Sequence, residues 1–260
     1  MIQLRAITQV LEEWAPPQWA DSYDNVGLLW GDPTRSIQGV LTTLDVTPAV
    51  LQEAKAVGAD LIIAHHPIWF GSRTRLRWDT YADKLIYQLI QADVSVYAIH
   101  TNADQASMGV NHALCRLLQL HPIRFLREED SHHGAGYIGE LPQPLSPVEF
   151  FRHLQSALQV PILRFSKGPE RPILRVAVCG GAGSFLLPEA LAGEVEAFLT
   201  ADIPYHRFFE AEGRLWLVDI GHYESEQMIG EVLAEVLRRH FPTLPIFATR
   251  VRTNPVHYWV

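Results

Sequence analysis

Short apolar runs alternate along the first half of the chain with stretches in which apolar residues recur at helical spacing. The runs at 39–46, 59–64 and 94–99 are rich in β-branched residues and nearly uninterrupted by charge, as in buried parallel strands. Residues 49–57 and 82–93 instead repeat apolar side chains every three or four positions, which predicts helices. The first half is therefore expected to form an α/β unit.

The second half repeats this alternation. Strands are predicted at 137–141, 162–167, 173–178, 195–201 and 214–221, and helices at 147–158, 184–193, 204–213 and about 224–239. Strands that alternate with helices favour parallel or mixed sheets with helices packed on their faces. The predicted fold class is α/β, with two α/β domains that each contain a mixed or parallel sheet flanked by helices.

The stretch 121–136 interrupts the pattern and is the best candidate for a domain boundary. It is polar, contains Pro122 and the charged run 127–130, and carries His132 and His133 beside glycines. A chain of 260 residues also exceeds the common size of one domain. We therefore predict domains at 1–126 and 127–260. Packing of the C-terminal helix back on the first domain is left open, and we interpret the two histidines as part of a linker.

Composition narrows the class of protein. A formal charge of -8 and a pI near 5.8 make nucleic acid an unlikely partner. The two cysteines are 64 residues apart, which indicates neither a disulfide framework nor a thiolate zinc site. The N-terminus lacks the apolar core of a signal peptide, and no run is long enough to cross a membrane. These features predict a cytoplasmic protein without membrane contact.

Residue types that bind metals follow three of the predicted strands directly. His65 and His66 follow the strand that ends at Ala64, and His100 and Asp104 follow the strand that ends at Ile99. Ligands of open α/β sheets collect at the carboxyl ends of strands. Each signal alone has another interpretation, because adjacent histidines can satisfy backbone carbonyls and Asp104 can cap a following helix.

His222 and Glu226 follow the last predicted strand. They are four residues apart at the start of a helix, so they share one helix face, although a plain hydrogen bond between them is the alternative. Three imidazoles and two carboxylates suit zinc, iron, manganese or nickel better than calcium or magnesium. The absence of a thiolate favours an open, catalytic site over a closed structural one. We therefore predict a metal site at strand carboxyl ends between the domains.

Other motifs are less specific. The glycine-rich run 179–183 follows a predicted strand like a phosphate-binding turn, but it lacks a dinucleotide fingerprint and a P-loop lysine, so a tight turn is the preferred interpretation. Tyr205 and His206 are weaker candidates for substrate contact. His100 is our candidate for proton transfer or for hydrogen bonding to a metal ligand.

Ordered motifs along nearly the whole chain resemble the Nif-three-like family, whose members are also called dinuclear metal-centre hexameric proteins or type 2 homologues of GTP cyclohydrolase I. The motifs are WADSYDNVGLLWGDP, LIIAHHPIWF, HTNADQASMGVNHAL, GYIGELPQPLS, VCGGAGSF, LTADIPYHRFFEA, IGHYESE and TNPVHYW. Two departures stand out. Ala201 replaces the usual glycine of a Thr-Gly-Asp segment, which leaves that turn's geometry open, and the extra central domain of longer members is missing.

The resemblance implies two metal ions per chain, bound by His65, His66, Asp104, His222 and Glu226, and a toroidal homohexamer with the metal sites facing its cavity. We interpret the chain as a metal-dependent hydrolase that acts on a small molecule, which could be a nucleotide. The alternatives are a protein that stores or delivers metal and, less favoured, a ring-shaped adaptor. The sequence identifies neither the native metal nor the substrate.

Overall fold

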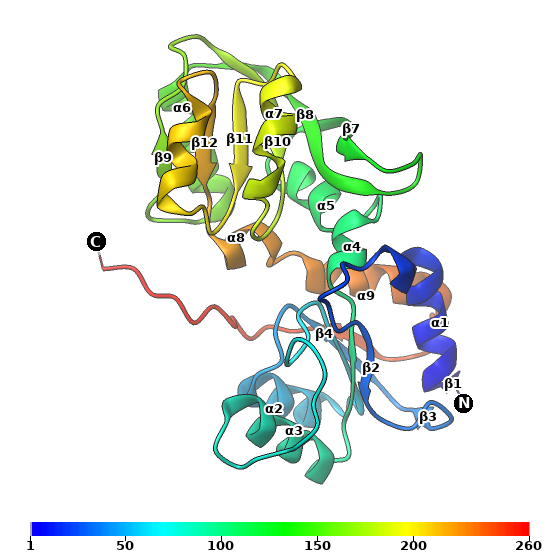
Figure 1. Cartoon of the computed structure of the whole chain (residues 1–260). Coiled ribbons are helices and arrows are strands. Elements are labelled where there is room, and N and C mark those ends of the chain that lie inside the picture. The colour runs from blue at the N-terminus through cyan, green and yellow to red at the C-terminus, as the bar shows by residue number, and fades with distance from the viewer. Residues whose placement is uncertain (1, 260) are drawn as a thin grey trace. The chain divides into compact units, whose positions relative to one another are not determined.

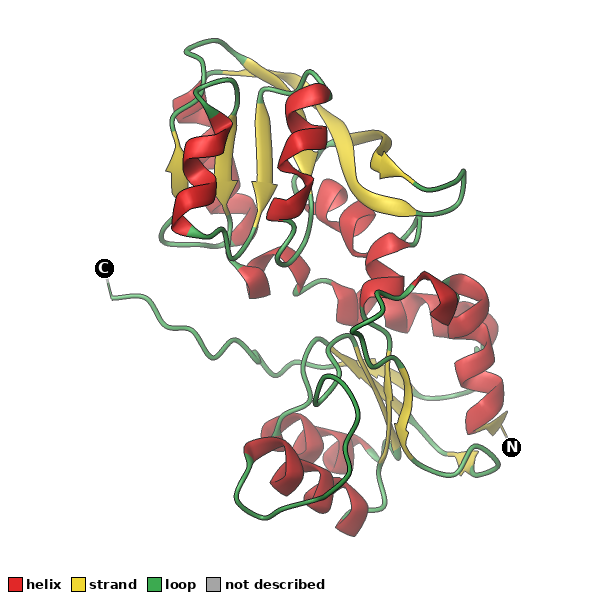
Figure 2. Cartoon of the chain, in the orientation of Figure 1, coloured by secondary structure: helices red, strands yellow, loops and turns green. Residues whose placement is uncertain are grey.

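The computed structural model describes residues 2–259, which form two compact units (Figure 1). Unit 1 contains Met1–Ala103 and Ile229–Asn254, and unit 2 contains Asp104–Met228 and Pro255–Val260. Each unit has its own sheet flanked by helices, so the α/β fold class is confirmed (Figure 2). Within residues 2–259, no helix is long and apolar enough to cross a membrane.

The sheet of unit 1 is mixed and has the strand order β13-β4-β5-β6-β2. β13, β4, β5 and β6 run parallel, and β2 pairs antiparallel with β6. All residues of β4, β5 and β6 are buried, which explains their uninterrupted apolar character. The strand bounds are β2 Gly27–Trp30, β4 Val40–Thr43, β5 Leu61–Ala64, β6 Ser95–Ala98 and β13 Ile246–Ala248, and a small separate sheet pairs β1 Ile2–Gln3 with β3 Ser36–Ile37.

Helices cover both faces of this sheet. α2 (Pro48–Val57) and α3 (Tyr81–Gln91) share a buried apolar cluster with one face, and α9 (Ile229–His240) contacts β4, β13 and α1 (Leu4–Trp14) (Figure 1). Both ends of α2 are capped: the Thr47 hydroxyl accepts a hydrogen bond from Val50 N, and Gly58 ends the helix with φ +72°. The 3₁₀ turn η1 (Pro17–Trp19) follows α1.

The sheet of unit 2 has the order β7-β8-β10-β11-β12-β9, with a parallel centre and antiparallel edges. Successive residues of the central strands enter different cores: Val176 and Val178 pack with α5 and α6, and Ala177 packs with α7. The strand bounds are β7 His121–Glu128, β8 Gly134–Leu145, β9 Arg164–Ser166, β10 Ile173–Val178, β11 Ala197–Thr200 and β12 Trp216–Asp219.

The helices of unit 2 other than α6 are short. α5 (Val110–Leu117) and α6 (Pro147–Leu158) pack on one face of the sheet, and α7 (Leu187–Ala192) packs on the other. The remaining helical segments are α4 Thr101–Gln105, η2 Ser184–Leu186, η3 Tyr205–Ala211 and α8 His222–Glu226. The segment 204–213, predicted as an α-helix, is thus a 3₁₀ helix at Tyr205–Ala211.

Two further predicted elements differ from the structure. Residues 121–136, predicted to be a polar linker, form most of the β7–β8 hairpin of unit 2. Its edge strand β7 buries only Phe125 and Leu126 and carries arginines on either side of them, which explains why the segment resembles a linker in the sequence. The single helix predicted at about 224–239 is broken into α8 and α9, and the unit boundary lies at this break, between Met228 and Ile229.

The chain accordingly divides elsewhere than at the 126/127 boundary expected from the sequence. α5 buries Leu114 and Cys115 against the sheet of unit 2, so unit 2 begins at Asp104. α9 belongs to unit 1, where the Thr42 hydroxyl donates a hydrogen bond to the Gly230 carbonyl over 2.6 Å. The sequence does not mark this boundary, because predicted strands and helices alternate in the same way before and after residue 103.

Candidate metal centre

Three histidines of unit 1 gather where β5 and β6 end. His65 and His66 follow β5, and their backbone N–H groups donate to the carbonyls of Thr43 and Leu44, so the chain stays extended beyond the strand. His100 follows β6 by two residues. The ring centroids of the three histidines lie 5.1 to 5.3 Å apart. One nitrogen from each ring lies within 4.8 Å of the others, a spacing that could hold a metal ion.

Each of these imidazoles is held through Nδ1. His65 Nδ1 lies 2.9 Å from the Ile99 carbonyl, His66 Nδ1 lies 2.7 Å from Asp45 Oδ1, and His100 Nδ1 lies 2.9 Å from Asp24 Oδ1. A carbonyl or an ionised carboxylate only accepts hydrogen bonds, so Nδ1 carries the proton and Nε2 keeps its lone pair. This tautomer is the one in which Nε2 can bind a metal.

The two carboxylates that hold His66 and His100 are themselves anchored. Thr253 donates its hydroxyl to Asp45 Oδ2 over 2.5 Å. Thr101 donates both its backbone N–H and its hydroxyl to Asp24 Oδ2. Burial raises the pKa of Asp24, but the hydrogen bonds from His100 and Thr101 outweigh it and hold that pKa well below its usual range. Asp24 is therefore an ionised acceptor at neutral pH.

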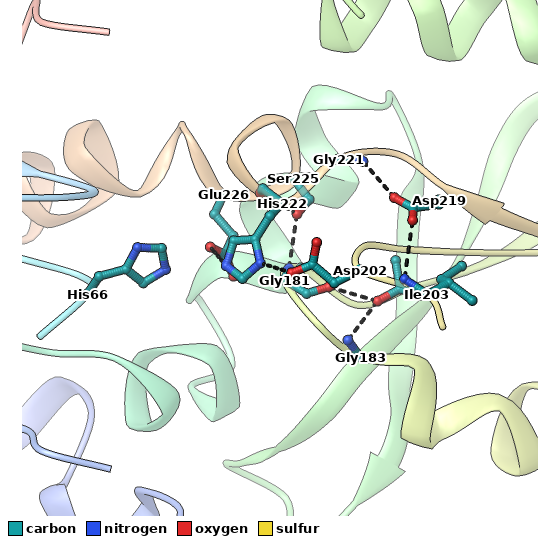
Figure 3. Close-up of polar contacts among 12 residues, drawn as sticks. His66, Gly181, Gly183, Asp202, Ile203, Asp219, Gly221, His222, Ser225 and Glu226 are labelled. Atoms are coloured by element: carbon teal, nitrogen blue, oxygen red, sulfur yellow. Dashed lines mark hydrogen bonds and ion pairs between the residues drawn. The ribbon is translucent and has the colours of Figure 1, made fainter. Parts of the chain in front are cut away.

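A second group of ligand types lies in unit 2, on the short helix α8 (Figure 3). His222 Nδ1 lies 2.7 Å from Asp202 Oδ2, and His222 Nε2 lies 3.1 Å from Glu226 Oε2. The i,i+4 spacing brings His222 and Glu226 together on one helix face, as the sequence predicted. The His222 side chain is partly exposed, whereas Glu226 is almost completely buried.

The glycine-rich turn after β10 packs directly against Glu226. Gly181 has φ +61°, and a Cβ atom placed there would lie 2.4 Å from Glu226 Oε1. Gly181 N donates to Ser225 Oγ over 2.9 Å, and Gly183 N donates to the Gly181 carbonyl (Figure 3). The run is thus a tight turn, and its lack of side chains makes room for a buried carboxylate.

Asp104 joins His222 and Glu226 as the third metal-ligand type in this group. It lies in α4, and a carboxylate oxygen of Asp104 is within 4.8 Å of one of Glu226. It does not cap α5, whose N-cap is Gly109. Burial, and then the charges of Asp104 and Glu226, raise the pKa of the Cys179 thiol far above its usual range. Cys179 therefore stays protonated and is a poor metal ligand beside these carboxylates.

The structure thus brings His65, His66 and His100 together in unit 1 and Asp104, His222 and Glu226 together in unit 2. The other histidines considered from the sequence lie elsewhere. His133 pairs with Asp130 in the β7–β8 turn, next to His132, which donates its backbone N–H to the same Asp130. Tyr205 and His206 begin η3. Tyr205 lines a pocket of about 420 Å³ together with Arg164, Phe165, Ser166, Phe208 and Phe209.

Sequence reasoning missed three carboxylates that orient the histidines: Asp24, Asp45 and Asp202. In the structure Asp45 follows β4 and Asp202 follows β11 by two residues each, so the strand-end rule applies to them as well. Asp24 precedes β2, which runs antiparallel to β6, and that direction was not predicted.

The turn that contains Asp202 keeps its shape despite Ala201. Asp202 is the residue with positive φ, +51°, whereas Ala201 is fully buried and donates its backbone N–H to the Gly181 carbonyl. Aspartate tolerates the left-handed region better than most residues do. Alanine at position 201, in place of the glycine usual in the family, is therefore compatible with the hydrogen bond between Asp202 and His222.

The donor atoms fit a transition metal. Nitrogen from imidazole and oxygen from carboxylate suit zinc, iron, manganese or nickel, and all four histidines have Nδ1 within hydrogen-bond distance of a carbonyl or carboxylate oxygen. A hydrogen bond from the second ring nitrogen to a carbonyl or carboxylate is typical of histidines that bind metals in proteins. The residues present therefore fit a metal centre.

Known proteins resemble the chain along its whole length. A Streptomyces coelicolor protein named "GTP cyclohydrolase 1 type 2 homolog" is 31% identical over 98% of this chain and 94% of its own. A Clostridium perfringens protein with the same name is 32% identical over 86% and 87% of the two chains. The crystal structure of Staphylococcus aureus protein SA1388 matches with a TM-score of 0.93 at 28% identity, covering 99% of both chains.

The model of one protein family covers residues 2–255. The resemblance inferred from the sequence motifs is thereby confirmed. The chain belongs to the Duf34/NIF3 (NGG1p interacting factor 3) family.

Proposed function

We propose that this protein is a metal-dependent hydrolase with two divalent transition-metal ions per chain. His65, His66, Asp104, His222 and Glu226 would bind the ions, with the histidines of unit 1 and the acidic group of unit 2 acting together. The observation that carries the proposal is the shared arrangement of His65, His66, His100 and His222, each of which has Nδ1 held by a carbonyl or carboxylate oxygen. Such an oxygen behind the ring is typical of histidines that bind metals through Nε2.

Bound ions of this kind polarise a scissile group and lower the pKa of water toward neutrality. Glu226 has two carboxylate oxygens and supplies negative charge to offset the charge of two cations. Asp24 holds the His100 ring, one nitrogen of which lies within 4.8 Å of a nitrogen of His65 and of His66. We assign His100 to proton transfer during hydrolysis, because an imidazole held in place by a carboxylate beside the ligands is the side chain most often used for that role.

The proposed substrate is a small molecule, and nucleotides come first because curated relatives carry the name GTP cyclohydrolase 1 type 2 homolog. A name shared through homology is a weaker guide than the chemistry of a site, so the substrate has to be measured. We further propose a cytoplasmic protein that assembles as a ring-shaped homohexamer. Light scattering would then give a mass about six times the 29.4 kDa of one chain.

Turnover tests the enzyme proposal. The protein loaded with zinc, iron, manganese or nickel should hydrolyse at least one member of a panel of nucleotides, phosphoesters and amides. Activity should vanish on chelation and return when the metal is restored. A protein that binds and releases ions but turns over nothing in the panel or in a metabolite extract would instead be a metal-storage or metal-delivery protein.

A further inference from the structure

Two exposed aromatic side chains lie beside the histidine group of unit 1. The Phe70 ring centroid is 5.7 Å from that of His100, and the Tyr23 centroid is 6.3 Å from that of Phe70. Phe70 is 57% exposed and Tyr23 is 60% exposed. Side chains of this size are usually buried, and water contact over so much aromatic surface is unfavourable. Their position next to His100 needs an explanation.

The segments that carry these rings are the same ones that hold the histidines. Asp24 turns inward to His100, and its neighbour Tyr23 meets Phe70. Asn25 then donates its side-chain amide to the Trp69 carbonyl over 3.1 Å, which fixes the backbone just before Phe70. Segment 23–25 therefore fastens the loop after His66 at a defined place. These contacts therefore fix the positions of both rings.

We propose that Tyr23 and Phe70 form an aromatic wall that stacks on a planar ring of the substrate and thereby selects heteroaromatic substrates. This inference rests on the proposed function, because it places the stacked ring next to His100. Exposed aromatic faces bind planar rings by stacking, which tolerates different ring identities and contributes to affinity without a change in the metal ligands. The wall is thus a specificity determinant, distinct from the metal-binding residues.

Unit 1 offers a matched control for this wall. Trp78 and Tyr87 form another exposed aromatic pair, with ring centroids 4.9 Å apart and exposures of 62% and 44%. Their ring contact is with each other, whereas Phe70 contacts a histidine of the proposed centre. A substitution in this pair therefore shows what loss of exposed aromatic surface does in general, for comparison with a substitution in the wall.

The test measures binding of GTP and of inorganic tripolyphosphate to metal-loaded protein by calorimetry. The two probes share a triphosphate, and only GTP carries a planar ring. The intact protein and Trp78→Leu should bind GTP at least about 10-fold more tightly than tripolyphosphate, and Phe70→Leu and Tyr23→Leu should each lose most of this preference. Phe70→Trp should keep it, because a larger ring also stacks.

Metal content, measured by elemental analysis on every variant, separates this proposal from the metal centre. Unchanged metal content in Phe70→Leu together with a lost preference for GTP supports the wall. Equal binding of the two probes by the intact protein, an unchanged preference in Phe70→Leu, an equal loss in Trp78→Leu, or loss of metal from Phe70→Leu would each overturn it. Absence of metal from the intact protein would instead contradict the proposed function.

Discussion

The two units hold their ligand groups by different chemistry. Unit 1 presents three imidazoles at the ends of buried strands. Of the two carboxylates that orient them, the Asp24 side chain is fully buried and the Asp45 side chain is 31% exposed. Unit 2 presents one imidazole and two carboxylates, and the partner of its imidazole, Asp202, is 60% exposed. Unit 1 therefore supplies orientation, whereas unit 2 supplies charge.

This difference teaches that, under the proposed function, each group would supply a different part of what two divalent cations need. Imidazoles alone would leave the charge of the ions uncompensated, and the carboxylates of Asp104 and Glu226 lie close to one another, which is costly without a cation. The division of donors explains why the sequence shows three modest motifs in place of one strong motif. Substitutions in each unit test this division of donors.

The largest effect is expected from Glu226→Gln, which removes charge from unit 2 but keeps shape and hydrogen bonding. Affinity for at least one ion should fall by about 100-fold or more, because a ligand itself changes, whereas loss of a partner behind a ligand costs about 10- to 100-fold. Any hydrolytic activity should be lost. Titration with the metal, followed by calorimetry, measures the change.

His132→Ala is the control for that variant, since His132 lies in the β7–β8 turn. It should leave metal affinity unchanged, and the thermal stability of metal-free Glu226→Gln should stay close to that of the intact protein. Wild-type affinity in Glu226→Gln, or loss of binding in His132→Ala, would show that the ligands are wrongly assigned.

A smaller effect, of about 10-fold in metal affinity, is expected when an orienting carboxylate is replaced by its amide. Asp45→Asn should weaken binding more than Asp202→Asn, because water screens the more exposed Asp202 more strongly. Calorimetric titration of both variants compares the two units directly. The reverse order would contradict the view that orientation comes mainly from unit 1.

Gly181→Ala should destabilise unit 2 by about 1–3 kcal/mol, because it adds backbone strain and a contact with Glu226. Gly213→Ala is the matched control: Gly213 has φ +70°, but the nearest atom to an added Cβ is 4.0 Å away. Denaturant unfolding of both variants separates strain from contact. If Gly181→Ala and Gly213→Ala lost the same amount of stability and the same amount of metal affinity, the close approach to Glu226 would be unimportant.

The sequence predicted the strand-end residues because their chemistry and their topology coincide. His65 and His66 follow a fully apolar strand, and the i,i+4 spacing of His222 and Glu226 is readable without any fold. The orienting residues were missed because hydrogen bonds between distant segments, such as Asp24 to His100 across 76 positions, leave no local pattern. Strand β13 was missed for a related reason, since three residues are too few to show a period.

Local sequence patterns do not mark the unit boundaries either. The polar hairpin β7–β8 resembles a linker in composition, and only its pairing with the rest of the sheet shows that it belongs to unit 2. Similarly, the break between α8 and α9 falls at Gln227 and Met228, where neither proline nor glycine marks it. Tertiary packing decided both features.

The smallest effect is expected on the fold when metal is removed. Both units contain large apolar cores that form without an ion, unlike small zinc modules that unfold when their metal is lost. Circular dichroism of the chelated protein should keep most of its native signal. Complete unfolding on chelation would make the metal structural and would contradict an open catalytic site.

The most direct test of the central claim is the number of transition-metal ions that one chain binds. Five ligands from two units exceed what a single open site normally uses, so titration of metal-free protein, checked by elemental analysis, should saturate at two ions per chain. Saturation at two ions, with lower affinity in Glu226→Gln, is the predicted result. A folded protein that binds no ion would contradict the account.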